Sequence, residues 1–359
     1  MNKYGLVLAG GGAKGAYQLG AWKAMQEIGI EFEAIVGVSI GSINGAFIAA
    51  GDFEKAEEFW NTAAVDKGVK ISRELKDYEN LLSYKNIPTL FKEVIENKGI
   101  DASPTKDFLS EYIDEERIRK SGIDLGVVSF SLSGFEPFEK FIRDIPEGQF
   151  VDYLLASSKI PGVNKIGPEG ERYLDGGFYD NAPVGMMLRH GYNKLIVVDI
   201  SLMKGVGHRN DTANSQIVYI KPNVPEELGG PMDFSREMYE KRLLMGYMDA
   251  QKAFGLLSGR SYYFGQGVFR EMVKQYGVEV CEQLEEIALE LGLERLKVYG
   301  PDEFITKVKE LCIDYLDEQN EKIARQEQRF YAPLLKRLPK FKTGKTYNEA
   351  IALLEEIIV

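Results

Sequence analysis

The sequence contains few of the residues on which several common kinds of protein depend. Only two of its 359 residues are cysteines, Cys281 and Cys312, which cannot build a disulfide framework and lack the spacing of metal ligands. Only two are histidines, His190 and His208, so there is little material for a Ser-His-Asp triad. No run of about 18 uncharged apolar residues occurs, so we expect no membrane-spanning helix.

The chain also has fewer basic than acidic residues, 44 against 55. The formal net charge is −11, which argues against nucleic acid as a partner and against strong attraction to anionic membranes. A local apolar or basic patch would still allow peripheral membrane contact. Residues 1–10 contain no basic segment followed by a long apolar core, so we expect no secretory signal and a cytoplasmic location, with thiols kept reduced.

Short apolar runs alternate with segments of helical periodicity through the first two thirds of the chain. This alternation is typical of a mainly parallel sheet buried between helices. Gly29 should end the first helix, and Asn181 should cap the helix that begins near Pro183. The predicted strands are 3–9, 32–37, 124–131, 194–200 and 216–220, and the predicted helices include 16–28, 43–50, 53–61, 150–158, 183–190 and 235–257.

The sequence changes character twice along its length. Residues 63–122 are charged and less regular, and we expect them to form a helical cap or insertion over one edge of the sheet. After residue 259 the apolar residues keep a helical period and no strand is expected. We therefore predict a catalytic domain at 1–259 and a helical C-terminal region at 260–359.

A Gly-x-Ser-x-Gly pentapeptide places Ser39 between a predicted strand and a predicted helix. Gly37 and Gly41 flank the serine and would let the chain fold back sharply, as in a nucleophile turn. The helix N-terminus behind the turn favours negative charge that develops there. By itself the pattern is weak, because a chain with 37 glycines contains such pentapeptides by chance.

A glycine-rich loop, residues 10–15, follows the first predicted strand. It could bind a dinucleotide, but a dinucleotide-binding loop needs an acidic residue after the second strand. The acidic candidates Glu31 and Glu33 precede that strand instead. It is not a P-loop, because no Ser or Thr follows Lys14. A plain tight turn and an oxyanion hole made of glycine amides are the other two interpretations.

Asp175-Gly176-Gly177 is most simply a turn, but the aspartate becomes a candidate base if a serine nucleophile lies nearby. His190 ends a predicted helix and His208 lies in a Gly-rich polar loop, so we expect neither to be catalytic. An α/β-hydrolase fold is also disfavoured, since it places its serine turn after several strands and only one strand precedes that of Ser39.

Three segments in this order resemble the patatin-like phospholipase family: GGGAKGAYQLG after the first strand, GVSIGSINGA after the second, and DGGFYDNAPV further on. SSKIPG and DFSREMYEKRLLMGYMDA add to the likeness, which covers about residues 3–257. Each motif is weak alone. Their order and their strand-turn-helix contexts make the resemblance specific, while the C-terminal helices match no family pattern.

The resemblance implies a three-layer α/β/α sandwich and a Ser-Asp dyad that needs no metal or cofactor. Ser39 would be the nucleophile and Asp175 its base, and residues 63–122 would correspond to a variable cap. The implied activity is hydrolysis of carboxylic esters of lipids or phospholipids. The alternatives are hydrolysis of water-soluble esters and a catalytically silent lipid-binding scaffold. The sequence leaves open whether the protein forms a homo-oligomer. The oxyanion hole would use the amides of Gly11 and Gly12 in a loop shaped by Gly10 and Ala13, with Lys14, Gly15, Gly37, Gly41, Gly176 and Gly177 supporting the motifs.

Overall fold

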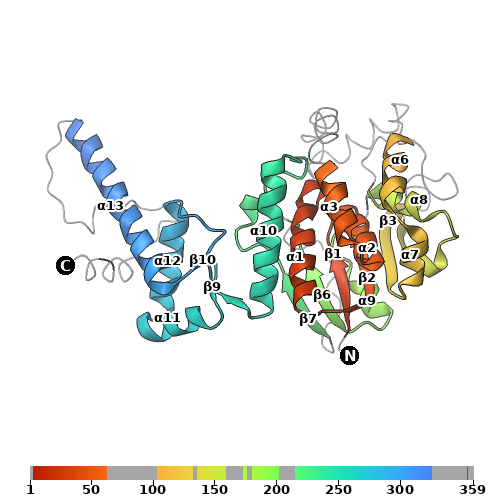
Figure 1. The fold of residues 1–359 in the computed structure, drawn as a ribbon, viewed down its shortest axis with the longest axis horizontal. Helices are drawn as coiled ribbons and strands as arrows, with labels where there is room; N and C mark the ends of the chain where they lie inside the picture. The colour runs from red at the N-terminus through yellow and green to blue at the C-terminus, as the bar shows by residue number, and fades with distance from the viewer. Residues whose placement is uncertain are drawn as a thin grey trace. The chain divides into compact units, whose positions relative to one another are not determined.

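The structure, a computed structural model, describes residues 3–62, 103–131, 136–158, 173–175, 180–201, 215–325 and 354. The chain forms two compact units, residues 1–250 and 251–359 (Figure 1). The predicted domain boundary at residue 259 falls slightly later in the chain and stays a prediction. Of the predicted cap at 63–122, residues 63–102 lie outside the described residues.

A seven-stranded sheet forms the centre of the first unit. Its order is β4-β3-β2-β1-β6-β7, with β5 also paired to β3. β1, β2, β3, β6 and β7 are parallel, whereas β4 and β5 run antiparallel to β3. The strands are β1 Tyr4–Leu8, β2 Phe32–Val38, β3 Asp124–Ser131, β4 Glu136–Phe141, β5 Tyr173–Asp175, β6 Lys194–Val198 and β7 Gln216–Ile220.

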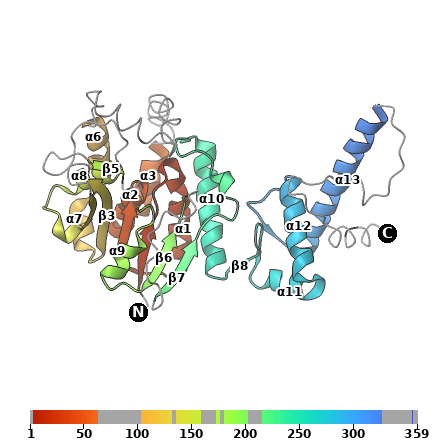
Figure 2. The same ribbon diagram turned by 180° about the vertical axis from the view of Figure 1, so that it is seen from behind.

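Helices cover both faces of this sheet. Figure 1 shows α1 and α2 in front of the strands, and Figure 2, seen from behind, shows α9 in front of them. Val36 packs with Met187 of α9 in one core cluster, while the Cα of Gly45 in α2 faces Ile35. The helices of this unit are α1 Ala16–Glu27, α2 Ile40–Ala50, α3 Phe53–Thr62, α6 Ser103–Tyr112, α7 Glu115–Lys120, α8 Phe150–Ser157, α9 Val184–Arg189 and α10 Arg236–Ala253, in which the unit ends.

The predicted α/β/α architecture is therefore confirmed, and the predicted strands of the sheet all form. β1 shows why they were recognisable: Leu6, Val7 and Leu8 are fully buried, because helices cover both faces of the strand and every position must be apolar. Strand β4 was not predicted. It is an edge strand with Glu, Lys and Pro in its sequence, and its half-exposed residues form no apolar run.

Helix α10 packs closely on α1 within the first unit. A Cβ on Gly246 would lie 1.8 Å from the carbonyl oxygen of Tyr17, and one on Gly20 would lie 1.8 Å from that of Leu243. Only glycine allows two helix backbones to approach so closely. Tyr17 then donates a buried hydrogen bond of 2.8 Å to Asp249. The contact fixes α10 beside the helix that follows the glycine loop.

The second unit is mainly helical, as expected, with helices α11 Val268–Tyr276, α12 Val278–Glu290 and α13 Pro301–Arg325. The expectation of no strand after residue 259 was wrong. β8 (Leu257–Ser258), β9 (Tyr263–Gly265) and β10 (Val298–Tyr299) form a small sheet whose strands are too short to leave a periodic signal. Among the described residues, no helix is both long and apolar enough to cross a membrane.

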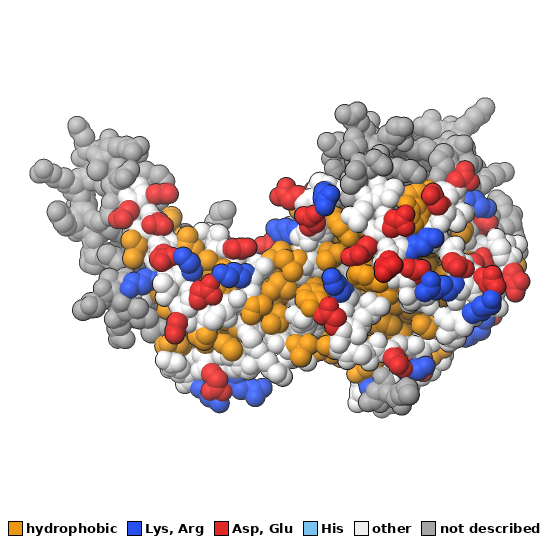
Figure 3. Space-filling view, viewed as in Figure 1, with side chains coloured by type: hydrophobic (Ala, Val, Ile, Leu, Met, Phe, Trp, Pro, Cys, Tyr) orange, Lys and Arg blue, Asp and Glu red, His pale blue; other side chains and the backbone are white. Residues whose placement is uncertain are grey.

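The surface of the described residues carries charges of both signs. On the face shown in Figure 3, Asp and Glu side chains are interspersed with Lys and Arg. The coloured part of this face thus presents no continuous basic surface of the kind that binds a polyanion.

Candidate active site

Ser39 occupies a strained turn between β2 and α2. Its φ of 53° and ψ of −126° make it the one non-glycine residue with a positive φ in the described part of the chain. Such a conformation costs about 1–3 kcal/mol and persists only when surrounding contacts hold it. The carbonyl oxygen of Ser39 accepts hydrogen bonds from the amide (2.9 Å) and the hydroxyl (2.6 Å) of Ser42. The predicted sharp turn at this serine is therefore present.

The two flanking glycines are required by close backbone packing. A Cβ on Gly37 would lie 2.3 Å from the carbonyl oxygen of Gly41, and a Cβ on Gly41 would lie 2.3 Å from that of Leu8 in β1. These neighbours are backbone atoms, which cannot rotate aside. The helix that follows Ser39 is consequently pressed against the strands that precede it, as the Gly-x-Ser-x-Gly pattern predicts.

Ser157, at the end of α8, anchors the turn from the other side. Its hydroxyl accepts a 2.9 Å hydrogen bond from the Ser39 amide and donates one of 2.5 Å to the carbonyl oxygen of Val128 in β3. Our reading of the sequence assigned no role to Ser157, although SSKIPG begins with it. Its position in that motif, just before Pro161, was the signal that could have revealed it.

The backbone of Asp175 lies close to the turn at Ser39. β4 pairs with one edge of β3, and β2 and β5 share the other edge. β2 ends with Val38 opposite Val128 of β3, and β5 ends with Asp175 opposite Ser129 of β3. The carboxyl ends of β2 and β5 thus meet head to head, one residue level apart, or about 3.4 Å along the strand. The Asp175 side chain and all of Gly176 and Gly177 lie outside the described residues.

The glycine loop lies beside Ser39. A Cβ on Gly10 would be 3.4 Å from the Cβ of Ser39, so there is little more than the space of one side-chain atom between the loop and the serine. The Gly10 amide donates to the carbonyl oxygen of Asn181 (3.2 Å), and the Ala13 amide donates to that of Pro231 (2.7 Å). The amides of Gly11 and Gly12 lie between these two anchored residues.

Within the described residues, the amides of Gly11 and Gly12 donate to no protein acceptor. Gly12 has a φ of 57°, and a Cβ there would lie 2.4 Å from the carbonyl oxygen of Pro231. Two adjacent N–H groups left without partners next to a serine are the donors that an oxyanion needs. The amides of Gly10 and Ala13, by contrast, are bound within the protein.

Asn181 was assigned the wrong role from the sequence. The residue that caps α9 is Pro183, and the Asn181 side chain instead donates to the carbonyl oxygen of Gly10 (3.2 Å). Together with the bond from the Gly10 amide, this makes a reciprocal pair that fixes the start of the glycine loop. The prediction failed because an Asn shortly before a proline is an ordinary helix-start signal, and the competing backbone partner is 171 residues away in the sequence.

Behind the loop, a buried network of side-chain amides joins three helices. Asn44 donates to the carbonyl oxygen of Gly15 (3.0 Å) and to Oε1 of Gln18 (2.8 Å), and it accepts a hydrogen bond from Nε1 of Trp60 (3.0 Å). Gln18 donates onward to the carbonyl oxygen of Ala9 at the end of β1 (2.6 Å). Every polar group of this network has a partner, so it ties the glycine loop to α1, α2 and α3.

Lys14 is buried, with 6% of its surface exposed. Burial lowers the pKa of its ammonium group, and the nearby Arg242 guanidinium lowers it further. His190 is exposed at the end of α9, as expected, and its Nδ1 lies 2.9 Å from the carbonyl oxygen of Met186. His208 lies outside the described residues. Glu31 and Glu33 are exposed and precede the end of β2. The position after β2, where a dinucleotide site needs an acidic residue, is occupied by Ser39.

A family model described as patatin-like phospholipase matches residues 6–188, about half of the chain. The chain belongs to the patatin-like phospholipase family. The match includes the glycine loop, Ser39, Ser157 and Asp175, so the resemblance read from the motifs is confirmed. Pro231 and Arg242, which contact the glycine loop, lie beyond its end.

Curated relatives include two proteins named lysophospholipase NTE1. The one from Cryptococcus neoformans is 26% identical over 210 residues, covering 58% of this chain and 12% of the relative. The one from Aspergillus oryzae is 29% identical over 206 residues, covering 55% and 12%. The aligned region of the patatin-like chain thus spans only about an eighth of the length of these relatives. The crystal structure of VipD from Legionella pneumophila aligns over 99% of this chain and 88% of its own, at 14% identity and a TM-score of 0.35, too low to support an argument.

Proposed function

We propose that this patatin-like protein is a serine acyl hydrolase that cleaves carboxylic esters of lipids with a Ser39–Asp175 dyad. The observation that carries the proposal is the meeting of β2 and β5 on one edge of β3, with a strained serine at the end of one strand and an aspartate at the end of the other. A patatin-like dyad needs no histidine, and the chain has only two. The unpartnered amides beside Ser39 supply the remaining element of an acyl-transfer site.

In the proposed mechanism, Asp175 accepts the hydroxyl proton of Ser39 as the serine oxygen bonds to the ester carbonyl carbon. The electron pair of the carbonyl double bond moves onto its oxygen, and the amides of Gly11 and Gly12 bind this oxyanion. Collapse of the tetrahedral intermediate breaks the bond to the leaving alcohol, which takes the proton from Asp175. Water then attacks the acyl-serine, gives its proton to Asp175, and releases the fatty acid as Ser39 is reprotonated.

A lipid is favoured over a small soluble ester on two grounds. The family model is that of a phospholipase, and the aligned relatives carry the name lysophospholipase, although the aligned region is a small part of their length. In addition, α6 of the expected cap packs aromatic side chains on α3: Phe108 stacks on Phe59 with ring centroids 5.3 Å apart, and Tyr112 meets Phe59 edge-on at 5.6 Å. Phe59 and Tyr112 are buried in this cluster, and the half-buried Phe108 is the ring that would offer apolar surface to an acyl chain.

The decisive experiment is labelling with a fluorophosphonate, which forms a covalent bond to an activated serine. We expect wild-type protein to be labelled and Ser39→Ala to be unlabelled, while Ser121→Ala, which removes the hydroxyl of an exposed residue just after α7, should label like wild type. Asp175→Asn should fold normally and label about 10²–10⁴-fold more slowly, the usual contribution of a general base. Undiminished labelling of Ser39→Ala would refute the assignment.

A series of nitrophenyl esters of increasing acyl length separates lipids from soluble esters. We expect kcat/KM to rise with chain length, because each additional buried CH₂ contributes about 0.8 kcal/mol of transfer free energy. A maximum at short chains would identify a hydrolase of soluble esters. Binding to lipid vesicles without turnover of any ester would identify a silent lipid-binding protein.

A further inference from the structure

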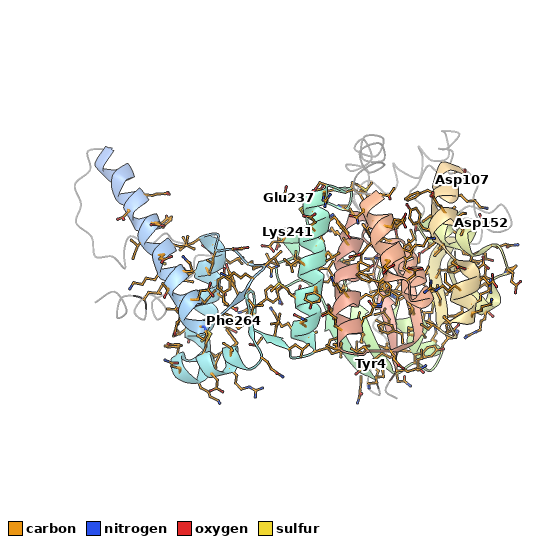
Figure 4. All side chains as sticks on the ribbon, viewed as in Figure 1. Tyr4, Asp107, Asp152, Glu237, Lys241 and Phe264 are labelled. Carbon is orange, nitrogen blue, oxygen red and sulfur yellow. The ribbon has the colours of Figure 1, made fainter. Side chains whose placement is uncertain are left out.

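Arg242 of α10 makes an unusual set of contacts for an arginine. Its side chain is buried, with 1% exposed, and it donates only to backbone carbonyl oxygens. Nε binds Leu228 (2.8 Å), Nη2 binds Gly230 (2.9 Å), and Nη1 binds both Asp233 (2.5 Å) and Ala13 (3.1 Å). Figure 4 labels Lys241, the preceding residue, on α10. The guanidinium thus joins the glycine loop to the segment 228–233.

The charge of Arg242 is not neutralised by direct contact. In the described part of the chain no carboxylate lies within ion-pair distance of it, although Asp233 attracts it more weakly from nearby. Burial lowers the pKa of the guanidinium to about 10, which still leaves it protonated at neutral pH. Burying a cation is costly, and the carbonyl groups of Leu228, Gly230, Asp233 and Ala13 offset that cost by accepting its hydrogen bonds. The arginine therefore does more than fill space.

The segment 228–233 shapes the part of the glycine loop that is left unpaired. The carbonyl oxygen of Pro231 accepts a hydrogen bond from the Ala13 amide (2.7 Å), and it lies 2.4 Å from where a Cβ on Gly12 would be. Arg242 binds carbonyl groups on both sides of Pro231, those of Gly230 and Asp233. It therefore sets the position of Pro231, and through it the direction in which the loop presents its free amides.

We propose that Arg242 is a positioning residue for the oxyanion hole: it clamps segment 228–233 and Ala13 so that the amides of Gly11 and Gly12 stay aimed at the developing oxyanion. This inference rests on the proposed hydrolase function and adds a residue from outside the family match. Its charge, which has no direct ion-pair partner among the described residues, also makes the potential at the loop more positive, together with the buried Lys14, and this favours negative charge in the transition state.

The test compares Arg242→Met, Arg242→Lys and Arg236→Met in steady-state hydrolysis of a nitrophenyl ester. Arg236 is an exposed arginine on the same helix, paired with Glu240, so its replacement is chemically matched and should leave both kinetic constants unchanged. A misaligned oxyanion hole weakens only the transition state. We therefore expect Arg242→Met to lower kcat by about 10²–10³-fold, the usual effect of losing an oxyanion donor, with KM within about threefold of wild type.

Arg242→Lys should lower kcat less than Arg242→Met does, because the cation remains. Its kcat should still fall below that of wild type, because an ammonium group has three donors and no planar fork to reach four carbonyl groups. If Arg242→Met fails to fold, Arg242→Lys decides the matter. A folded variant with a lower kcat at constant KM supports the proposal. A kcat within threefold of wild type, or a change in KM alone, overturns it. Loss of the proposed function would look different: wild-type protein would then be inactive, or Ser39→Ala would still be labelled.

Discussion

Replacing Asn44 with leucine should destabilise the first unit, although the two side chains branch in the same way. Asn44 is buried, and the change would remove a hydrogen-bond partner from three groups at once: the carbonyl oxygen of Gly15, Oε1 of Gln18 and Nε1 of Trp60. All three would remain inside the protein, because α1, α2 and α3 enclose them. The leucine cannot accept or donate a hydrogen bond to any of them.

The expected size of the effect follows from this count. A buried polar group that loses its partner costs about 1–3 kcal/mol. Oε1 of Gln18 and Nε1 of Trp60 would lose their partner entirely, whereas the carbonyl oxygen of Gly15 keeps the hydrogen bond that an N-cap carbonyl accepts within its own helix. Two such groups, partly offset by about 1 kcal/mol from the apolar leucine, lower the free energy of unfolding by about 1–5 kcal/mol. With a urea m-value near the upper end of about 1–3 kcal/mol/M, the unfolding midpoint should fall by about 0.3–1.7 M.

Tryptophan fluorescence in urea is a suitable assay, since both tryptophans of the chain, Trp22 and Trp60, belong to the first unit. The control is Asn193→Ala, which removes an exposed side-chain hydrogen bond of 3.2 Å to the carbonyl oxygen of Gly191 and should shift the midpoint only slightly. If Asn44→Leu unfolds within about 0.3 M of wild type, the network contributes little and the reasoning from unsatisfied groups is wrong.

Two further predictions concern other buried positions. Gly41→Ala should lower the free energy of unfolding by about 3 kcal/mol or more, because its Cβ would lie 2.3 Å from a backbone oxygen of β1. Gly51→Ala, at a residue with φ 64° and open space around it, should lower it by only about 1–2 kcal/mol. The same urea titration measures both changes. Burial raises the pKa of Cys281 and Cys312 to about 11, so iodoacetamide at pH 8 should leave both thiols of the folded protein unmodified by mass spectrometry, and modify them in urea. Because the unfolded thiols lose their protons near pH 9, the stability of the second unit should fall as the pH rises from about 9 to 11; rapid alkylation of the folded protein would contradict both statements.

The central strands and the serine turn could be predicted because their signals are local. β1 and β2 are buried on both faces, so their sequences are apolar throughout, and the turn at Ser39 depends on Gly37 and Gly41, two residues away on either side. The edge strand β4 and the short strands of the second unit have no such signal. Partial exposure or small length lets them carry almost any residue.

The supporting contacts of the site could not be predicted, because each joins residues that are far apart in the sequence. Asn181 binds the start of the glycine loop, Ser157 binds the Ser39 amide, and Arg242 binds Ala13 across 229 residues. An Asn before a helix, a Ser at a helix end and an Arg within a helix all have commoner local explanations. Only the three-dimensional arrangement shows which backbone group each side chain reaches.

These remote contacts bear on how far the pentapeptide alone can define a nucleophile. The flanking glycines leave room for the backbone of Ser39 to adopt φ 53°, but they do not offset the strain of about 1–3 kcal/mol in that conformation. The offsetting hydrogen bonds come from Ser42, one position beyond the pentapeptide, and from Ser157, which is 118 residues from Ser39. The same five residues at the surface of another fold would lack Ser157 and would relax to an ordinary turn. Replacing Ser157 with alanine would therefore test whether the strained turn survives without its distant partner.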